Sequence, residues 1–449
     1  MKAKWAVNNP AAFPHSEAPM RYTLPLLLAG TLLAAVSCTD GSPVGPSLDP
    51  VARTASVTTP GTGPWARVVE GETGPGSLYA LYIPANWNGD AIYYAHGIRP
   101  PLDPITLNDQ DNFFEVRDAL GGLGYAFAYS SFSENGLAVK DGVQRTHQLR
   151  GLLNSQLETQ PQRSYLAGYS LGALVAVELA ERFPGQYDGV LAMCGMVGGT
   201  PMELQYVGDV RALFDAYFPG VLPGSPTSIA TPMTLAQVQA AVIGAIRADP
   251  LGAVKMFAIA STAQTPLAFV PNWTPRVPGT GVETSVAFET MAQSLIVALY
   301  YQNIGTPDVL GRTRGHSPYD NRTRTYTMGT PAVPSPALVP LVQGMIAGSN
   351  QSVTRYDITP DAQNYLEKNY VPTGNLGIPV LSVHNLWDYL VPSFHEPAFA
   401  GIVGSAGSSS MLLQRTVQNY GHCNFPTPLV VSSFQTLSNW VTTGIKPAS

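Results

Sequence analysis

Residues 168–172 constrain the fold of this chain more than any other stretch, because they read G-Y-S-L-G, a G-x-S-x-G pattern. An apolar run at 164–167 precedes them, and a helix-forming run at 173–180 follows. A serine on a tight turn between a strand and a helix is displayed at its tip, and flanking glycines remove side chains that would clash there. The pattern therefore predicts that Ser170 is a nucleophile on a strand–turn–helix element.

The residues on both sides of this turn indicate an α/β sheet. From Trp65 onward, short apolar runs alternate with amphipathic stretches. We expect strands near 78–83, 91–95, 125–130, 164–167, 189–194, 378–383 and 411–417. We expect helices near 112–123, 140–157, 171–183 and 428–441.

A long segment interrupts the strand pattern. About 180 residues separate the strand near 189–194 from the strand near 378–383, far more than a crossover connection needs. Helical patterns fill this segment, near 202–218, 234–247, 251–261, 287–302, 337–347 and 360–370. We therefore expect a helical cap at 199–375, inserted between two parts of one core at 65–198 and 376–449. A separate second domain is the alternative, and the return of the core pattern speaks against it.

The N-terminal segment has the features of an export signal. Residues 24–36 are apolar but too short to span a membrane, and Met20 followed by a basic residue is a natural start. We expect residues 1–38 to be a signal peptide. Residues 39–64 are rich in Gly, Pro, Ser and Thr, which predicts a flexible linker.

The end of this signal resembles a bacterial lipoprotein cleavage box. Small residues precede Cys38, with Ala35 where such boxes more often have leucine. This pattern predicts lipidation of Cys38 and a lipid anchor in the cell envelope. The alternative is an ordinary secretory signal cut near Ser37, which would leave the cysteine without a role.

Composition excludes several classes of function. The formal net charge is −6 with no basic stripe, so we expect no nucleic-acid partner. Charged residues make up only 12% of the chain, against about a quarter in typical proteins, which suits an exported, loop-rich enzyme. The sequence has no H-E-x-x-H, C-x-x-C or P-loop pattern, so we expect no metal and no cofactor.

A serine hydroxyl needs a base within hydrogen-bond reach and a third group that fixes the tautomer of that base. Asp388 is the only aspartate between the strand near 378–383 and the end of the chain, with Glu396 as a fallback in the helix that follows. His422 is the only histidine after the strand near 411–417. The order Ser170, Asp388, His422 predicts three loop tips on one edge of the sheet.

The negative charge that develops on a substrate oxygen needs backbone N–H donors. One should come from Leu171, at the start of the helix after the nucleophile. The other should come from Ile98, because His96-Gly97 ends an early strand and allows a sharp turn. A plain strand-end turn is the alternative, and His96 is interpreted as a residue that orients the loop.

Together, residues 168–172, His96-Gly97, Asp388 and Gly421-His422 resemble the α/β-hydrolase superfamily, and within it bacterial secreted serine esterases and lipases. The resemblance covers about 65–198 and 376–449. It implies a mostly parallel twisted sheet flanked by helices and a catalytic triad. The cap expected at 199–375, before the strand that carries the acid, lies outside the resemblance. In tannase and feruloyl-esterase relatives a cysteine before the serine bonds one after the histidine. Here the cysteine after the histidine is present, but Tyr169 precedes the serine.

Two cysteines remain if Cys38 is lipidated. Cys194 ends the strand after the elbow helix and Cys423 follows His422, so both lie at the carboxyl edge of the sheet. A disulfide between them would hold the histidine loop in an oxidising compartment. Two unpaired thiols, with Cys194 buried in the core, are the alternative.

The leading hypothesis is a serine carboxylic ester hydrolase that acts on a small-molecule or polymeric ester. Tyr169 and Trp387 flank catalytic residues and are candidates for substrate contact, and the cap should line an apolar cleft. An aminopeptidase of the same fold is the alternative, with Glu203, Asp209 or Asp215 holding a free amine. A non-catalytic binding protein on this fold is a third.

Overall fold

The computed structural model describes residues 56–109, 111–265, 282–329 and 336–448. In these residues the strands form one sheet in the order β1-β2-β3-β5-β4-β6-β7-β8-β9. The strands are β1 (Val57–Pro60), β2 (Trp65–Thr73), β3 (Ser77–Pro84), β4 (Asp90–Ala95), β5 (Ala126–Ser130), β6 (Arg163–Tyr169), β7 (Gly189–Met193), β8 (Val380–Trp387) and β9 (Leu412–Tyr420).

The sheet changes character along its width. Strands β1, β2, β3 and β5 pair antiparallel, whereas β5, β4, β6, β7, β8 and β9 pair parallel. Every residue of β4, β5 and β7 is buried, as expected for central parallel strands covered on both faces. The carboxyl ends of the parallel strands therefore share one edge, where the loops predicted to carry the site begin.

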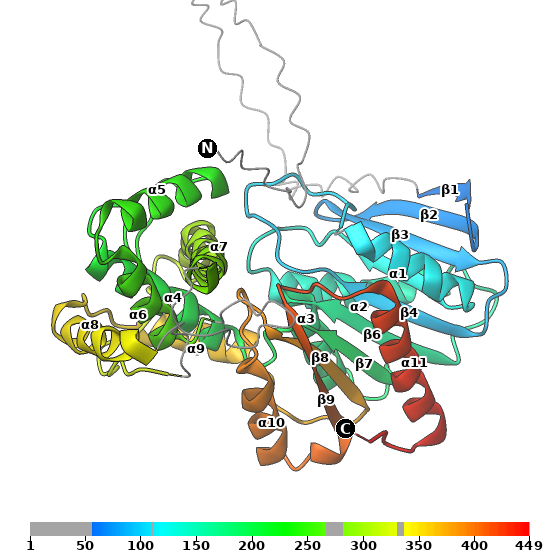
Figure 1. The fold of residues 1–449 in the computed structure, drawn as a ribbon. Helices are drawn as coiled ribbons and strands as arrows, with labels where there is room; N and C mark the ends of the chain where they lie inside the picture. The colour runs from blue at the N-terminus through cyan, green and yellow to red at the C-terminus, as the bar shows by residue number, and fades with distance from the viewer. Residues whose placement is uncertain (1–55, 110, 266–281, 330–335, 449) are drawn as a thin grey trace, which may run out of the picture. The chain divides into compact units, whose positions relative to one another are not determined.

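Helices cover both faces of this sheet (Figure 1). One face packs against α2 (Val139–Asn154) and α3 (Leu171–Arg182) through an aliphatic cluster. The other packs against α1 (Asp111–Gly122) and α11 (Thr427–Thr443) through a cluster rich in aromatic residues. The predicted α/β class, a mostly parallel sheet flanked by helices, is confirmed. No helix in the described part of the chain is long and apolar enough to cross a membrane.

A helical segment lies between β7 and β8, two strands that are neighbours in the sheet, with Val190 opposite Val380. We call it the insertion. Its helices are α4 (Thr200–Tyr217), α5 (Leu235–Ala248), α6 (Gly252–Ala263), α7 (Val282–Arg312), α8 (Val339–Ser352) and α9 (Pro360–Tyr370). Helices α4 to α8 share a hydrophobic cluster of their own, whereas Leu366 of α9 belongs to the aliphatic cluster on the sheet. After them, α10 (His395–Ser405) joins β8 to β9.

The N-terminal boundary differs from the prediction of a linker at 39–64. Residues 57–60 form β1, which pairs with β2 from Val57 opposite Glu70 to Pro60 opposite Arg67. All four side chains of β1 are exposed, so this edge strand has no apolar alternation that the sequence could reveal. The predicted signal peptide, Cys38 and the rest of the linker up to residue 55 lie outside the described residues.

Candidate active site

Ser170 lies on a tight turn that requires a positive φ and two neighbouring glycines. It joins β6 to α3 with a φ of 56°, in the left-handed region that L-residues rarely adopt. A Cβ on Gly172 would lie 2.0 Å from the carbonyl oxygen of Ala95, and one on Gly168 would lie 2.1 Å from that of Gly172. Both glycines are therefore required for the chain to turn this closely against β4.

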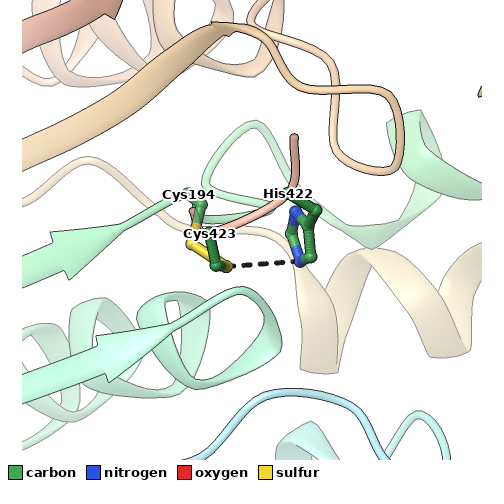
Figure 2. Close-up of side chains that lie close together, drawn as sticks. All are labelled: Cys194, His422 and Cys423. Atoms are coloured by element: carbon green, nitrogen blue, oxygen red, sulfur yellow. Dashed lines mark hydrogen bonds between the residues drawn. A yellow bond between two sulfur atoms is a disulfide. The ribbon is translucent and has the colours of Figure 1, made fainter. Parts of the chain in front are cut away.

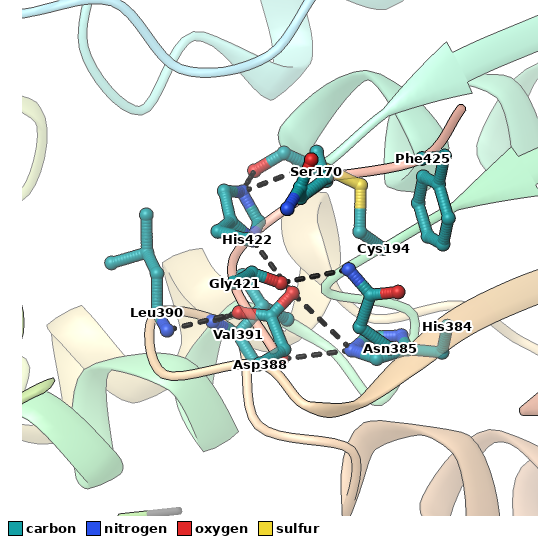
Figure 3. The surroundings of a disulfide bond; sticks show 12 residues. Ser170, Cys194, His384, Asn385, Asp388, Leu390, Val391, Gly421, His422 and Phe425 are labelled. Atoms are coloured by element: carbon teal, nitrogen blue, oxygen red, sulfur yellow. Dashed lines mark hydrogen bonds and ion pairs between the residues drawn. A yellow bond between two sulfur atoms is a disulfide. The ribbon is translucent and has the colours of Figure 1, made fainter. Parts of the chain in front are cut away.

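The structure brings together the three side chains that the sequence predicted (Figure 3). His422 Nε2 lies 2.9 Å from Ser170 Oγ, and His422 Nδ1 lies 2.8 Å from Asp388 Oδ2. This geometry fits an imidazole that donates Nδ1–H to the carboxylate and accepts the serine hydroxyl at Nε2. Ser170 is 2% exposed and Asp388 is fully buried, so both act in a water-poor environment.

The carboxylate of Asp388 is held from both sides. Its Oδ1 accepts the N–H groups of Leu390 and Val391, each at 2.9 Å, which leaves Oδ2 for the histidine. The loop of His422 is tied to the same region, because the side-chain amide of Asn385 donates to the carbonyl of Gly421 at 2.8 Å. Residues at the end of β8 therefore fix the positions of Asp388 and His422 relative to each other.

A second buried histidine, which sequence reasoning did not assign, supports this carboxylate. His384 Nε2 donates to the carbonyl of Val391 at 2.8 Å and lies 3.7 Å from Asp388 Oδ2, while Nδ1 lies 3.2 Å from Glu396 Oε1. Burial alone would lower the pKa of His384, but Glu396 and then Asp388 raise it above its usual value. Glu396, the fallback acid, is engaged here and not with His422. The signal was a histidine four residues before Asp388, inside a strand whose first six residues are all buried.

Cys194 and Cys423 form a disulfide beside the histidine, with their Cα atoms 5.3 Å apart (Figure 2). Cys423 Sγ lies 3.4 Å from His422 Nε2. These two sulfurs and the imidazole lie within 4.8 Å of one another, a spacing that could suit a metal ion. Because the sulfurs are bonded to each other, they are not available as the thiolate ligands that such a site would use.

The loop predicted to carry one oxyanion donor borders the nucleophile. A Cβ on Gly97 would lie 3.3 Å from Ser170 Cβ, so this glycine allows the loop to approach. His96 Nδ1 lies 2.6 Å from the carbonyl oxygen of Gly97, and its ring stacks on Phe132 with centroids 3.9 Å apart. Burial, followed by the charge of Arg99, lowers the pKa of His96 to about 3. His96 therefore contacts this loop as a neutral side chain, and its role in orienting the loop stays a prediction.

A pocket of about 580 Å³ opens beside Ser170, and both the core and the insertion line it. Its walls are mostly apolar: Ile98, Pro101, Gly136, Leu137, Ser170, Met196, Thr200, Glu203, Leu204, Val207, Tyr301, Ile304, Gly305, Asp308, Val309, Leu390 and Val391. Of the three acids considered as amine ligands, only Glu203 lies in this lining. Asp209 instead pairs with Arg324 and accepts from two tyrosines, and Asp215 pairs with Arg211.

The expectation that Tyr169 contacts the substrate is wrong. Its ring lies in the aromatic cluster on the α1 and α11 face, 6.0 Å from the ring of Tyr94. Successive residues of a strand point to opposite faces, so a neighbour of the nucleophile in sequence need not share its face. Trp387 is the last residue of β8 and is not among the residues that line the pocket beside Ser170. Leu390 and Val391, in the loop that follows, do line it.

Parts of this chain resemble known proteins. A family model described as "Putative esterase" matches residues 143–243, which include the serine turn. No curated protein matches the chain in sequence. Among solved structures, the rice cell wall degrading esterase LipA from Xanthomonas oryzae is similar over 83% of this chain and 89% of its own, with 13% identity and a TM-score of 0.38. Feruloyl esterase B from Aspergillus oryzae is similar over 85% and 81%, with 13% identity and a TM-score of 0.41. Similarity this low carries no argument about the substrate.

Proposed function

We propose that this chain, a member of the α/β-hydrolase superfamily, is a serine hydrolase that cleaves carboxylic esters through an acyl-enzyme intermediate. The observation that carries the proposal is the hydrogen-bonded series from Ser170 through His422 to Asp388. The series lies in loops at the carboxyl edge of a parallel sheet, beside an apolar pocket. The esterase family match across the serine turn supports the reaction class.

In this mechanism Ser170 Oγ attacks the acyl carbon while His422 Nε2 takes the hydroxyl proton. The ester C–O bond breaks, and the alcohol leaves with the proton that His422 returns. Water then attacks the acyl carbon, His422 again accepts a proton, and the acid is released from a restored Ser170. Asp388 keeps Nδ1–H directed at itself, so that Nε2 faces the serine in each step.

The backbone N–H groups of Leu171 and Ile98 are proposed to hold the oxyanion. Leu171 begins α3, so the helix dipole favours negative charge there. Ile98 follows the glycine that borders Ser170 and lines the pocket. A single preorganised donor of this kind is worth about 3–4 kcal/mol in the transition state.

The test compares wild type with Ser170→Ala on p-nitrophenyl esters of increasing acyl length. We expect kcat to fall by about 10⁴-fold or more, because the variant has no nucleophile. A fluorophosphonate probe should label wild type and leave Ser170→Ala unlabelled, whereas the exposed-serine control Ser432→Ala should behave as wild type in both assays. Turnover of esters by Ser170→Ala at the wild-type rate would overturn the proposal, and faster turnover of aminoacyl amides than of esters would replace it with a peptidase.

We also propose that the protein is exported and anchored through Cys38. The small residues before this cysteine and the Gly/Ser-rich stretch after it support the proposal. The Cys194–Cys423 disulfide suits an oxidising compartment. Palmitate incorporation in cells should depend on Cys38, and equal incorporation into Cys38→Ser would contradict the anchor.

A further inference from the structure

The pocket beside Ser170 contains polar groups that the triad does not use. Thr200 and Glu203 both line it, from the first turn of α4. Residues three apart on a helix lie on the same face, so the two side chains are neighbours. Thr200 is fully buried and Glu203 is 8% exposed, although nearly all of the surrounding wall is hydrocarbon.

The hydroxyl of Thr200 has no hydrogen-bond partner among the described residues. A buried hydroxyl left in this state costs about 1–3 kcal/mol, and native structures rarely keep such a group without a reason. Thr200 is the first residue of α4, and its side chain does not cap the helix. Its hydroxyl is therefore open to a group brought into the pocket.

The carboxyl group of Glu203 has a neutral hydrogen-bond partner, and its own hydrogen-bonding capacity is not filled by this contact. His395 Nδ1 accepts the N–H of Gly198 at 3.2 Å, so Nε2 carries the proton and donates to Glu203 Oε2, also at 3.2 Å. Burial, and then the charge of His384, lowers the pKa of His395 to about 3, so this imidazole brings no positive charge. Burial, and then the charge of Asp388, raises the pKa of Glu203 well above its usual value. This shift favours the protonated form of Glu203, which can both donate and accept a hydrogen bond at Oε1.

The other carboxyl group in the pocket is already occupied. Asp308 accepts the N–H of Leu137 at 2.7 Å and pairs with Arg312 at 3.0 Å. A cationic substrate would need a free carboxylate, but Asp308 is already paired, and burial beside Asp388 disfavours the charged form of Glu203. The observations therefore favour a neutral polar group on the substrate over an amine.

We propose that Thr200 and Glu203 form a polar subsite that binds a hydroxyl group on an otherwise apolar acyl chain. The acyl side is chosen because the acyl carbon becomes bonded to Ser170, which lines the same pocket. This inference rests on the proposed ester hydrolysis and names hydroxyacyl esters as its preferred substrate class.

The test measures kcat/KM for matched p-nitrophenyl esters: butyrate against 3-hydroxybutyrate, and hexanoate against 6-hydroxyhexanoate. In wild type, the ratio for at least one pair should favour the hydroxy ester by about tenfold or more, because its hydroxyl satisfies buried partners. Thr200→Val and Glu203→Leu should each bring that ratio towards one. Glu203→Gln, which keeps a neutral donor and acceptor, should retain most of the preference.

Asp361→Asn is the control, because it removes a carboxylate of the insertion that is 77% exposed and outside the pocket lining. Its hydroxy-ester ratio should equal that of wild type. A wild-type ratio near one in both pairs, or a ratio unchanged in Thr200→Val and Glu203→Leu, would overturn the subsite while leaving ester hydrolysis intact. Preference for 6-aminohexanoate, lost in Glu203→Gln, would overturn it in favour of a cation site. If no ester is hydrolysed by wild type, the proposed function itself fails.

Discussion

At the scale of single residues, the orientation of His422 depends on one carboxylate. Asp388→Asn would keep the acceptor that Leu390 and Val391 use but would place the amide NH2 group, a donor, against the imidazole. We expect kcat to fall by about 10³–10⁴-fold, with a small change in KM, because the histidine would lose its working tautomer. Steady-state kinetics would measure both constants. A kcat within tenfold of wild type would show that another group orients the base.

Glu178 gives a prediction about pH and stability. Burial raises the pKa of Glu178 to about 8, although Arg182, 2.6 Å away, partly lowers it. The folded state therefore binds this proton more tightly than the unfolded state, so stability is highest below the unfolded pKa and is lost as pH rises towards 8. Glu178→Gln should gain unfolding free energy relative to wild type between pH 5 and pH 8, and the gain should level off above. Urea denaturation at pH 5, 7 and 9 would measure this difference, and a constant difference would contradict it.

At the scale of elements, α7 is fastened to the core by a cluster of polar contacts. Arg312 pairs with Glu134 at 2.8 Å, donates to the carbonyl of Asn135 at 2.7 Å and pairs with Asp308 in the preceding turn. A Cβ on Gly136 would lie 2.4 Å from the Asp308 carboxylate, so the loop and the helix approach closely. The position of the pocket wall around Gly136 and Asp308 depends on these contacts between the loop and α7, which we call the junction.

Arg312→Ala should lower the free energy of unfolding by about 1–3 kcal/mol, because it leaves half-buried acceptors without a donor. It should also raise KM, since the wall carrying Asp308 would shift. Arg322→Ala is a matched control: its pair with Asp357 is exposed on both sides, so a change below about 1 kcal/mol is expected. Equal losses in the two variants, measured by chemical denaturation, would contradict the assigned role of the junction.

Elements with clear patterns were predictable and others were not. The serine turn is flanked by a buried strand and a strongly apolar helix, so local rules identify it. Helix α7 was expected only near 287–302, yet it continues to Arg312 through Pro307, because contacts with the core offset the missing hydrogen bond. The polar subsite at Thr200 was not predicted, since its place depends on how the insertion packs beside the triad.

At the scale of the whole molecule, the disulfide joins positions separated by 229 residues and so closes a loop that contains the insertion. Removing a native disulfide costs about 2–5 kcal/mol in small domains. We expect Cys194→Ala/Cys423→Ala to melt at a lower temperature and to lose kcat, because Cys423 adjoins His422. Thermal unfolding with and without a reductant would measure this, and the reductant should not affect the double variant. A reductant effect of equal size in both proteins would contradict the assignment.

The sequence could predict which three side chains meet at the edge of the sheet, but not their surroundings. Ser170, Asp388 and His422 each follow a strand, and parallel strands bring such loops together. The orientation of Tyr169 and the exposed strand β1 depend on tertiary contacts that no local pattern carries. The pairing of Cys194 with Cys423 likewise needed coordinates, because chain order does not determine the distance between two loops.

The backbone at Ser170 has a consequence for how such a chain would change over generations. At a φ of 56°, a residue with a Cβ destabilises the folded state by about 1–2 kcal/mol relative to glycine. Ser170→Gly should therefore melt higher than wild type while being inert. In a lineage that did not need the reaction, substitution of this serine by glycine would be favoured, because the glycine form is more stable although it is inactive. The proposed ester hydrolysis accounts for a serine at this position despite its backbone cost.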